Sequence, residues 1–200
     1  MSIRAALALM VLLVGTCGAA ADDDTQRIRG TITQVDGPTL TIATREGATV
    51  RVTLKPGARV AAVVPAELAA AKPGSFVGSA AVPQADGTLK AQEVLIFPEA
   101  MRGVGEGHRP WDLTPDSTMT NATVEATVAA ASGHELTLTY QGGQQRLVVP
   151  PGTPIVTLEP GDEKLLQPGN HVFLGASPDG VGGFSATRIM VGKDGLVPPM

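Results

Sequence analysis

The sequence predicts an all-β protein made of two tandem five-stranded OB-like Greek-key barrels, each with a short helix between strands 3 and 4. The first observation that predicts this fold is the high frequency of Gly and Pro along the chain. Its 200 residues include 24 Gly and 16 Pro, too dense for long helices, and the runs between them are rich in Val, Thr, Ile and Leu. The second is a duplication, because the Pro-Gly pairs at 56–57 and 73–74 recur 95 positions later at 151–152 and 168–169. Three strands, a short helix and two strands, in that order, are typical of the OB-fold.

The first copy, residues 27–97, shows the alternation that defines half-buried strands. Leu40 and Ile42 fall on one face of their run and threonines on the other. Pro65 followed by helix-forming residues predicts one or two helical turns that end at Lys72-Pro73-Gly74. The expected strands are 27–35, 39–44, 48–54, 75–82 and 88–97, with the helix at 64–71.

The second copy, residues 122–192, repeats this order. Its expected strands are 123–130, 135–140, 144–149, 170–176 and 183–191, with a short helix at 161–166. A domain of about 70 residues buries only about 60% of its unfolded surface, so we expect the two copies to share an interface. A small SH3-like barrel or an open β-sandwich is the alternative for each copy. The tail 193–200 is expected to be loosely attached.

The N-terminus has the features of a secretory signal peptide, residues 1–21. A positive start with Arg4 precedes an apolar run of ten residues, and Ala19-Ala20-Ala21 fits a cleavage site. The run is too short to span a bilayer, which takes about 20 residues. The protein is therefore expected to be periplasmic or extracellular, without a membrane span. The alternative is a lipoprotein anchored at Cys17, the only cysteine.

Charge and cysteine content exclude several classes of function. Cleavage after Ala21 removes Arg4 from the 15 basic residues and none of the 19 acidic ones, which changes the net charge from −4 to −5. An acidic protein without aromatic residues on strands 2 and 3 of its first copy is a poor match for nucleic acid. The processed chain would also lack cysteine, and therefore thiol nucleophiles, thiolate ligands and disulfides.

The segment between the copies, residues 98–121, is the candidate binding region. It holds the only Trp of the chain, and its candidate binding residues are His108, Arg109, Trp111 and Asp112. A Trp flanked by charged residues resembles a binding hot spot. The alternative is that Trp111 plugs the end of a barrel and locks the two copies together.

Neither catalysis nor a cofactor is predicted. No nucleophile motif is present, and the three histidines have no partner four residues away. No metal ligands are assigned, although His108 with nearby carboxylates is the candidate for a metal-handling role.

The pattern Gly-Thr-Ile-x-x-Val-Asp-Gly-x-x-Leu-Thr-Ile at 30–42, followed by Lys-Pro-Gly-x-Phe-Val-Gly at 72–78, resembles exported proteobacterial proteins of unassigned function built from tandem OB-like β-barrel repeats. The resemblance implies an extracytoplasmic location and an OB-like fold, and it supplies no site residues. Some proteins of this type carry labels linking them to metal transport, but no transmembrane helix follows the signal here. The expected function is non-enzymatic, a cell-envelope adaptor that binds a protein or polysaccharide. A periplasmic metal-handling accessory protein is the alternative, and the oligomeric state stays open.

Overall fold

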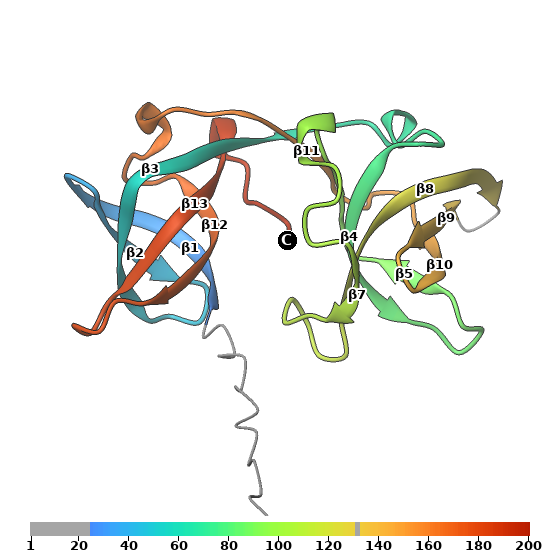
Figure 1. Ribbon diagram of the computed structural model, residues 1–200, viewed down its shortest axis with the longest axis horizontal. Coiled ribbons are helices and arrows are strands. Elements are labelled where there is room, and N and C mark those ends of the chain that lie inside the picture. Colours follow the sequence, from blue (N-terminus) through green and yellow to red (C-terminus); the bar gives the residue numbers. More distant parts are fainter. Residues whose placement is uncertain (1–24, 131–132) are drawn as a thin grey trace, which may run out of the picture.

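The computed structural model describes residues 25–130 and 133–200, which form two β lobes joined by a ribbon of two strands (Figure 1). All 13 strands belong to one continuous hydrogen-bonded sheet. The predicted signal peptide 1–21, with Cys17, lies outside the described residues. Within the described part of the chain, no helix has the length and apolarity needed to cross a membrane.

The first lobe is a closed five-stranded barrel and contains both ends of the described chain, so we call it the terminal lobe. Its strands pair in the closed order β1-β2-β3-β13-β12-β1, and only β3 and β13 run parallel. The predicted all-β class and a five-stranded barrel are thereby confirmed. The strands are β1 (Gln26–Asp36), β2 (Thr39–Thr44), β3 (Thr49–Pro65), β12 (His171–Pro178) and β13 (Phe184–Gly192).

The second lobe, the central lobe, has the closed pairing order β4-β5-β10-β9-β8-β4. Again one pair, β5 with β10, is parallel. A short strand, β7, adds to the outer side of β8. The strands are β4 (Phe76–Pro83), β5 (Leu89–Ala91), β7 (Gly107–Pro110), β8 (Thr118–Ala130), β9 (Gly133–Tyr140) and β10 (Gly143–Val149).

Each lobe therefore combines strands from both sequence copies. The terminal lobe takes three strands from residues 27–97 and two from 122–192, and the central lobe takes the complementary set. The predicted arrangement of one barrel for each copy, with boundaries at 27–97 and 122–192, is not confirmed. The cause is the length of β3, which continues as a strand through Lys55-Pro56-Gly57 to Pro65. Its last five residues, 61–65, pair with β11 and lead out of the terminal barrel, so the strands that follow lie in the other lobe.

The far end of β3 forms the ribbon with β11 (Ile155–Pro160), and β6 (Val94–Ile96) continues the sheet from β11 to β4. The helical segments are single 3-10 turns instead of the predicted one-to-two-turn helices. They are η1 (Leu68–Ala70), η2 (Glu99–Met101), η3 (Glu163–Leu165) and η4 (Lys193–Gly195). Each has three residues, and η1 and η3 are both followed at the third position by a Pro-Gly pair that prevents continuation.

Three apolar clusters stabilise this arrangement. Alternating residues such as Leu40, Ile42, Leu136 and Leu138 are fully buried and fill the two lobes, as their period of two requires. A third cluster lies between the lobes and includes Val63, Leu95 and Met200. The predicted loose attachment of the tail 193–200 is wrong, because Met200 is 3% exposed and the chain ends between the lobes (Figure 1).

Candidate functional site

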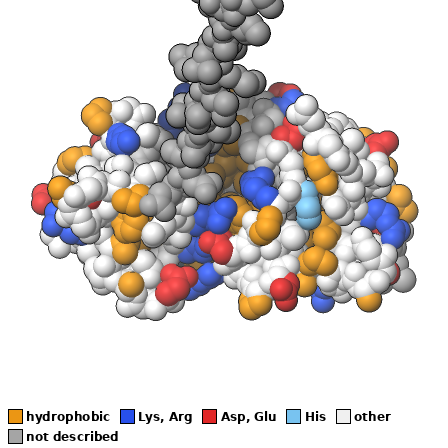
Figure 2. All heavy atoms as spheres, turned by 60° about the horizontal axis from the view of Figure 1, so that its bottom comes forward, with side chains coloured by type: hydrophobic (Ala, Val, Ile, Leu, Met, Phe, Trp, Pro, Cys, Tyr) orange, Lys and Arg blue, Asp and Glu red, His pale blue; other side chains and the backbone are white. Residues whose placement is uncertain are grey.

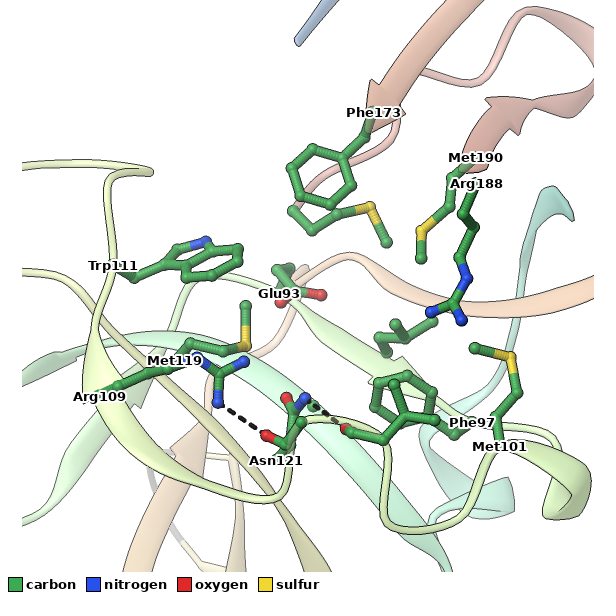
Figure 3. A pocket seen from close by; sticks show the side chains of 15 residues that line it. Glu93, Phe97, Met101, Arg109, Trp111, Met119, Asn121, Phe173, Arg188 and Met190 are labelled. Carbon is green, nitrogen blue, oxygen red and sulfur yellow. Dashed lines mark hydrogen bonds between the residues drawn. The ribbon is translucent and has the colours of Figure 1, made fainter. Parts of the chain in front are cut away.

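A cavity of about 150 Å³ lies between the two lobes and is lined by residues from both (Figure 3). From the central lobe and its loops come Glu93, Arg109, Trp111 and Asn121. From the terminal lobe comes Phe173, on β12. The wall of the cavity therefore requires both lobes.

The methionines of the protein converge on this cavity. The chain has six, two of which, Met1 and Met10, lie outside the described residues. The other four all line the cavity although they are spread over 100 positions of the chain: Met101, Met119, Met190 and Met200. Methionine is flexible and polarisable, and it is used at surfaces that adapt to different ligands.

Aromatic side chains gather at the same place. Trp111 and Phe173 lie with ring centroids 6.3 Å apart across the lobe boundary. Phe97 lines the cavity on the side of the central lobe and packs against Phe76 at 5.3 Å. The aromatic fraction of the chain is only 3%, and this concentration marks the cavity as the most aromatic place in the protein.

Glu93 lies in the cavity wall between β5 and β6 and is completely buried. Its Oε1 accepts a hydrogen bond from the Ala80 N–H at 2.8 Å, and its backbone oxygen accepts one from the Ser79 hydroxyl at 2.6 Å. Burial raises the pKa of the Glu93 carboxyl to about 8, and the Ala80 hydrogen bond opposes this only in part. At neutral pH the group is therefore mainly a neutral acid that can donate a hydrogen bond into the cavity.

Three buried polar atoms have no hydrogen-bond partner within the part of the chain that the structure describes, and all three belong to cavity-lining residues. They are Glu93 Oε2, Trp111 Nε1 and Asn121 Oδ1. Asn121 is oriented by a hydrogen bond from its Nδ2 to the Val104 carbonyl oxygen at 3.0 Å. Gly78 permits this position, because a Cβ there would lie 2.7 Å from Asn121 Oδ1. A buried polar atom without a partner costs about 1–3 kcal/mol, so a site that collects three of them is prepared for a ligand or water.

Next to the cavity lies an open hollow of about 850 Å³, which we call the mouth. The mouth is adjacent to the cavity, because the two share six lining residues: Gly105, Arg109, Trp111, Phe173, Arg188 and Met190. Basic side chains gather between the lobes beside hydrophobic ones (Figure 2).

Three guanidinium groups surround the indole of Trp111. The Cζ of Arg27 lies 3.9 Å from the ring centroid, that of Arg109 5.7 Å and that of Arg29 5.8 Å. Cation–π attraction holds such groups over an aromatic face. Trp111 is therefore held between the lobes by these contacts and lines the cavity.

Asp112 joins the two lobes through ion pairs. Its Oδ1 accepts from Arg29 Nη2 at 2.7 Å and its Oδ2 lies 3.5 Å from Arg27 Nη1. Burial alone would raise the pKa of Asp112, but the hydrogen bond from Arg29 and the charges of Arg29 and Arg27 lower it overall. Arg29, only 8% exposed, also donates from Nε to the Met200 carbonyl oxygen at 2.8 Å and so fixes the end of the chain.

Of the four residues predicted from the sequence, three come together and one does not. Arg109, Trp111 and Asp112 lie at the lobe boundary. His108 points to the other face of β7, where its Nδ1 lies 2.8 Å from the Thr120 hydroxyl and its ring stacks on Tyr140 at 6.3 Å. Burial, with the nearby charge of Arg109, lowers the pKa of His108. Glu93, Asn121 and the methionines were not predicted, because nothing local in the sequence distinguishes them.

Residues 25–130 and 133–200 contain no group of three or more His, Cys, Asp or Glu side chains that could hold a metal ion. Glu106, two residues before His108, accepts a hydrogen bond from the Gln141 N–H at 2.9 Å and lines the mouth. A metal site at His108 therefore has no support from its surroundings.

Comparison of the chain with protein-family models, with curated proteins and with solved structures finds no match. A function therefore has to be inferred from the geometry and chemistry of the cavity.

Proposed function

We propose that the chain is an exported, non-enzymatic binding protein whose ligand is a small, largely apolar molecule held in the cavity between the lobes. The observation that carries this is the coincidence of three unpartnered buried polar atoms with one apolar cavity. Ligand sites are mostly apolar concavities with a few placed polar groups, and they occur preferentially where domains meet. Glu93, Trp111 and Asn121 are the groups that would orient the ligand.

The fold supports this role. We propose that the protein is a duplicated OB-like unit whose copies exchange their last two strands, so that the segment 98–121 and the chain end close the space between them. The location outside the cytoplasm rests on the features of residues 1–21. We therefore propose a small ligand in place of the protein or polysaccharide partner expected for an envelope adaptor. The reason is that Trp111 packs between the lobes and is not presented as a free anchor to a large partner.

A second candidate is the handling of a soft metal ion, and the convergence of the methionines favours it. Thioether sulfur is a ligand for Cu(I), and four thioethers face one cavity. This version of the metal-handling role uses Met101, Met119, Met190 and Met200 in place of His108.

The experiment uses Trp111, the only Trp, as a reporter. Trp111 emission and the thermal midpoint Tm are followed during titration with compact neutral probes, phenylacetamide and benzyl alcohol, and separately with silver ion as a stable stand-in for Cu(I). The test variant is Val104→Phe, which fills space at the cavity wall. The matched control is Val128→Phe, since Val128 is 60% exposed on β8.

An apolar-ligand site predicts saturable changes in the wild type and the control that Val104→Phe removes. Silver binding that Met190→Leu weakens, with no response to the organic probes, would replace the first candidate by the second. Absence of any saturable response would refute both.

A further inference from the structure

The charges around the cavity do not balance. Four arginines, Arg27, Arg29, Arg109 and Arg188, line the mouth or surround Trp111, whereas the chain as a whole carries a net charge of −4. Within the described ranges, the carboxylate paired with these arginines is Asp112, which binds Arg27 and Arg29. A basic cluster in an acidic protein indicates the sign of the charge that it attracts.

Arg109 and Arg188 have no ion pair among the residues that the structure describes. Arg109 uses Nη1 to donate to the Gly105 carbonyl oxygen at 2.7 Å, and its other N–H groups have no acceptor in that part of the chain. Its pKa is lowered by burial and by the charge of Arg27, so an anion beside it would relieve a repulsion already present. Arg188 is exposed on β13 and reaches the same cavity from the opposite side (Figure 3).

The floor of the cavity does not supply the missing negative charge. Glu93 is buried without a charged partner and is mainly neutral at pH 7. Glu106 lines the mouth and accepts from the Gln141 N–H, so with Asp112 it brings two acidic side chains against the four arginines, and basic groups remain in excess. The cavity is therefore lined mainly by apolar side chains, and basic groups are in excess around it and the adjacent mouth.

We infer that the ligand is a small amphipathic organic anion, with its carboxylate bound by Arg109 in the field of Arg27 and Arg188 and its apolar body among Trp111, Phe173 and the methionines. This inference rests on the proposed function and names the ligand class for the same cavity. The arginine geometry suits a carboxylate, whose two oxygens can accept from adjacent N–H groups of one guanidinium. The body is limited to a single ring or a short chain by the cavity volume of about 150 Å³.

The test compares pairs of probes that differ in charge and not in shape. Phenylacetate and phenylacetamide form one pair, and octanoate and octanamide the other. Each is titrated calorimetrically at pH 7 into the full chain, expressed with residues 1–21 in place so that any processing occurs. The variants are Arg109→Gln and Arg188→Gln, and the control is Arg51→Gln, an exposed arginine of β3 that lines neither the cavity nor the mouth.

The inference predicts that at least one carboxylate binds about tenfold or more tightly than its amide, as a charged hydrogen bond requires. Arg109→Gln should remove that preference and leave binding of the amide unchanged, Arg188→Gln should reduce it, and Arg51→Gln should preserve it. Raising the salt concentration should weaken only the carboxylate.

Equal binding of acid and amide would overturn the anionic ligand and leave the cavity as a binding site. An unchanged preference in both Arg109→Gln and Arg188→Gln would also overturn it. If no member of either pair binds, the proposed function fails together with the inference.

Discussion

The pH dependence of stability tests whether the Glu93 carboxyl is buried and uncharged in the cavity wall. The carboxyl is fully buried, and within the described chain it has one hydrogen bond, from Ala80, and no charged partner. Its pKa is about 8 in the folded protein against an ordinary 4.5. A raised pKa means that the folded state binds the proton more tightly than the unfolded state, so stability falls as pH rises through this interval.

The size of the effect follows from the difference in pKa. Each pKa unit corresponds to about 1.4 kcal/mol. Between the ordinary pKa and pH 7 only the unfolded state ionises, so the free energy of unfolding falls by about 3 kcal/mol. The full interval to the folded pKa amounts to about 5 kcal/mol. Glu93→Gln retains an oxygen for the Ala80 N–H and removes the ionisation.

The assay is urea unfolding of wild type and Glu93→Gln at pH 4.5, 7 and 9. The stability gained by the variant should be smallest at pH 4.5, reach about 3 kcal/mol at pH 7 and level off above the folded pKa. Glu67→Gln, at an exposed carboxylate, is the matched control. A pH-independent difference for Glu93→Gln would show that the carboxyl is ionised and paired, and the description of the cavity floor would be wrong.

Three further predictions concern the lobe boundary and the strand exchange. Deleting residues 197–200 should lower the free energy of unfolding by about 2 kcal/mol, because Arg29 keeps its ion pair with Asp112 but loses a charged hydrogen bond to the Met200 carbonyl oxygen. Urea unfolding measures this, and an unchanged midpoint would contradict the docked tail. Asp112→Asn should lower the free energy of unfolding by under about 1 kcal/mol, because the Asp112 carboxylate is half exposed. Since the pKa of Asp112 is lowered, the wild type should lose this advantage as pH falls below the ordinary pKa of Asp. A difference in stability that stays constant down to pH 2 would count against the ion pairs. Fragments 22–97 and 98–200 should each fail to form a stable monomer, because each lobe takes strands from both fragments. Mixed one to one, they should combine and recover the β-sheet circular dichroism signal. A cooperatively folded monomer of 22–97 would refute the exchange of strands.

The sequence predicts which residues face the core but not which strands pair. Alternation places Leu40 and Ile42 on one face of their strand, and the structure buries both, because a period of two determines the face of a strand. It does not determine the partner, since the last two strands of either copy can complete the same kind of barrel. The continuation of β3 past Pro56-Gly57 decides the outcome, and the pair reads locally as the end of a strand.

The same distinction applies to the site. Trp111 and its charged neighbours are visible in the sequence because they are adjacent and unusual in a chain poor in aromatic residues. His108 is separated from them by the alternation of β7, which sends consecutive side chains to opposite faces. Glu93 and the methionines meet only where the two lobes pack together, so no local pattern could identify them.

The most direct test of the central claim, that the space between the lobes is a ligand site, is a methyl NMR titration. The methyl groups of Met101, Met119, Met190 and Met200 all report on the cavity, and those of Ile32 and Ile42 report on the barrel core. Addition of phenylacetate to protein labelled at both residue types should shift the four methionine signals saturably with one common affinity and leave both isoleucine signals in place. Saturable shifts of the isoleucines without the methionines, or no saturable shift at all, would contradict the account.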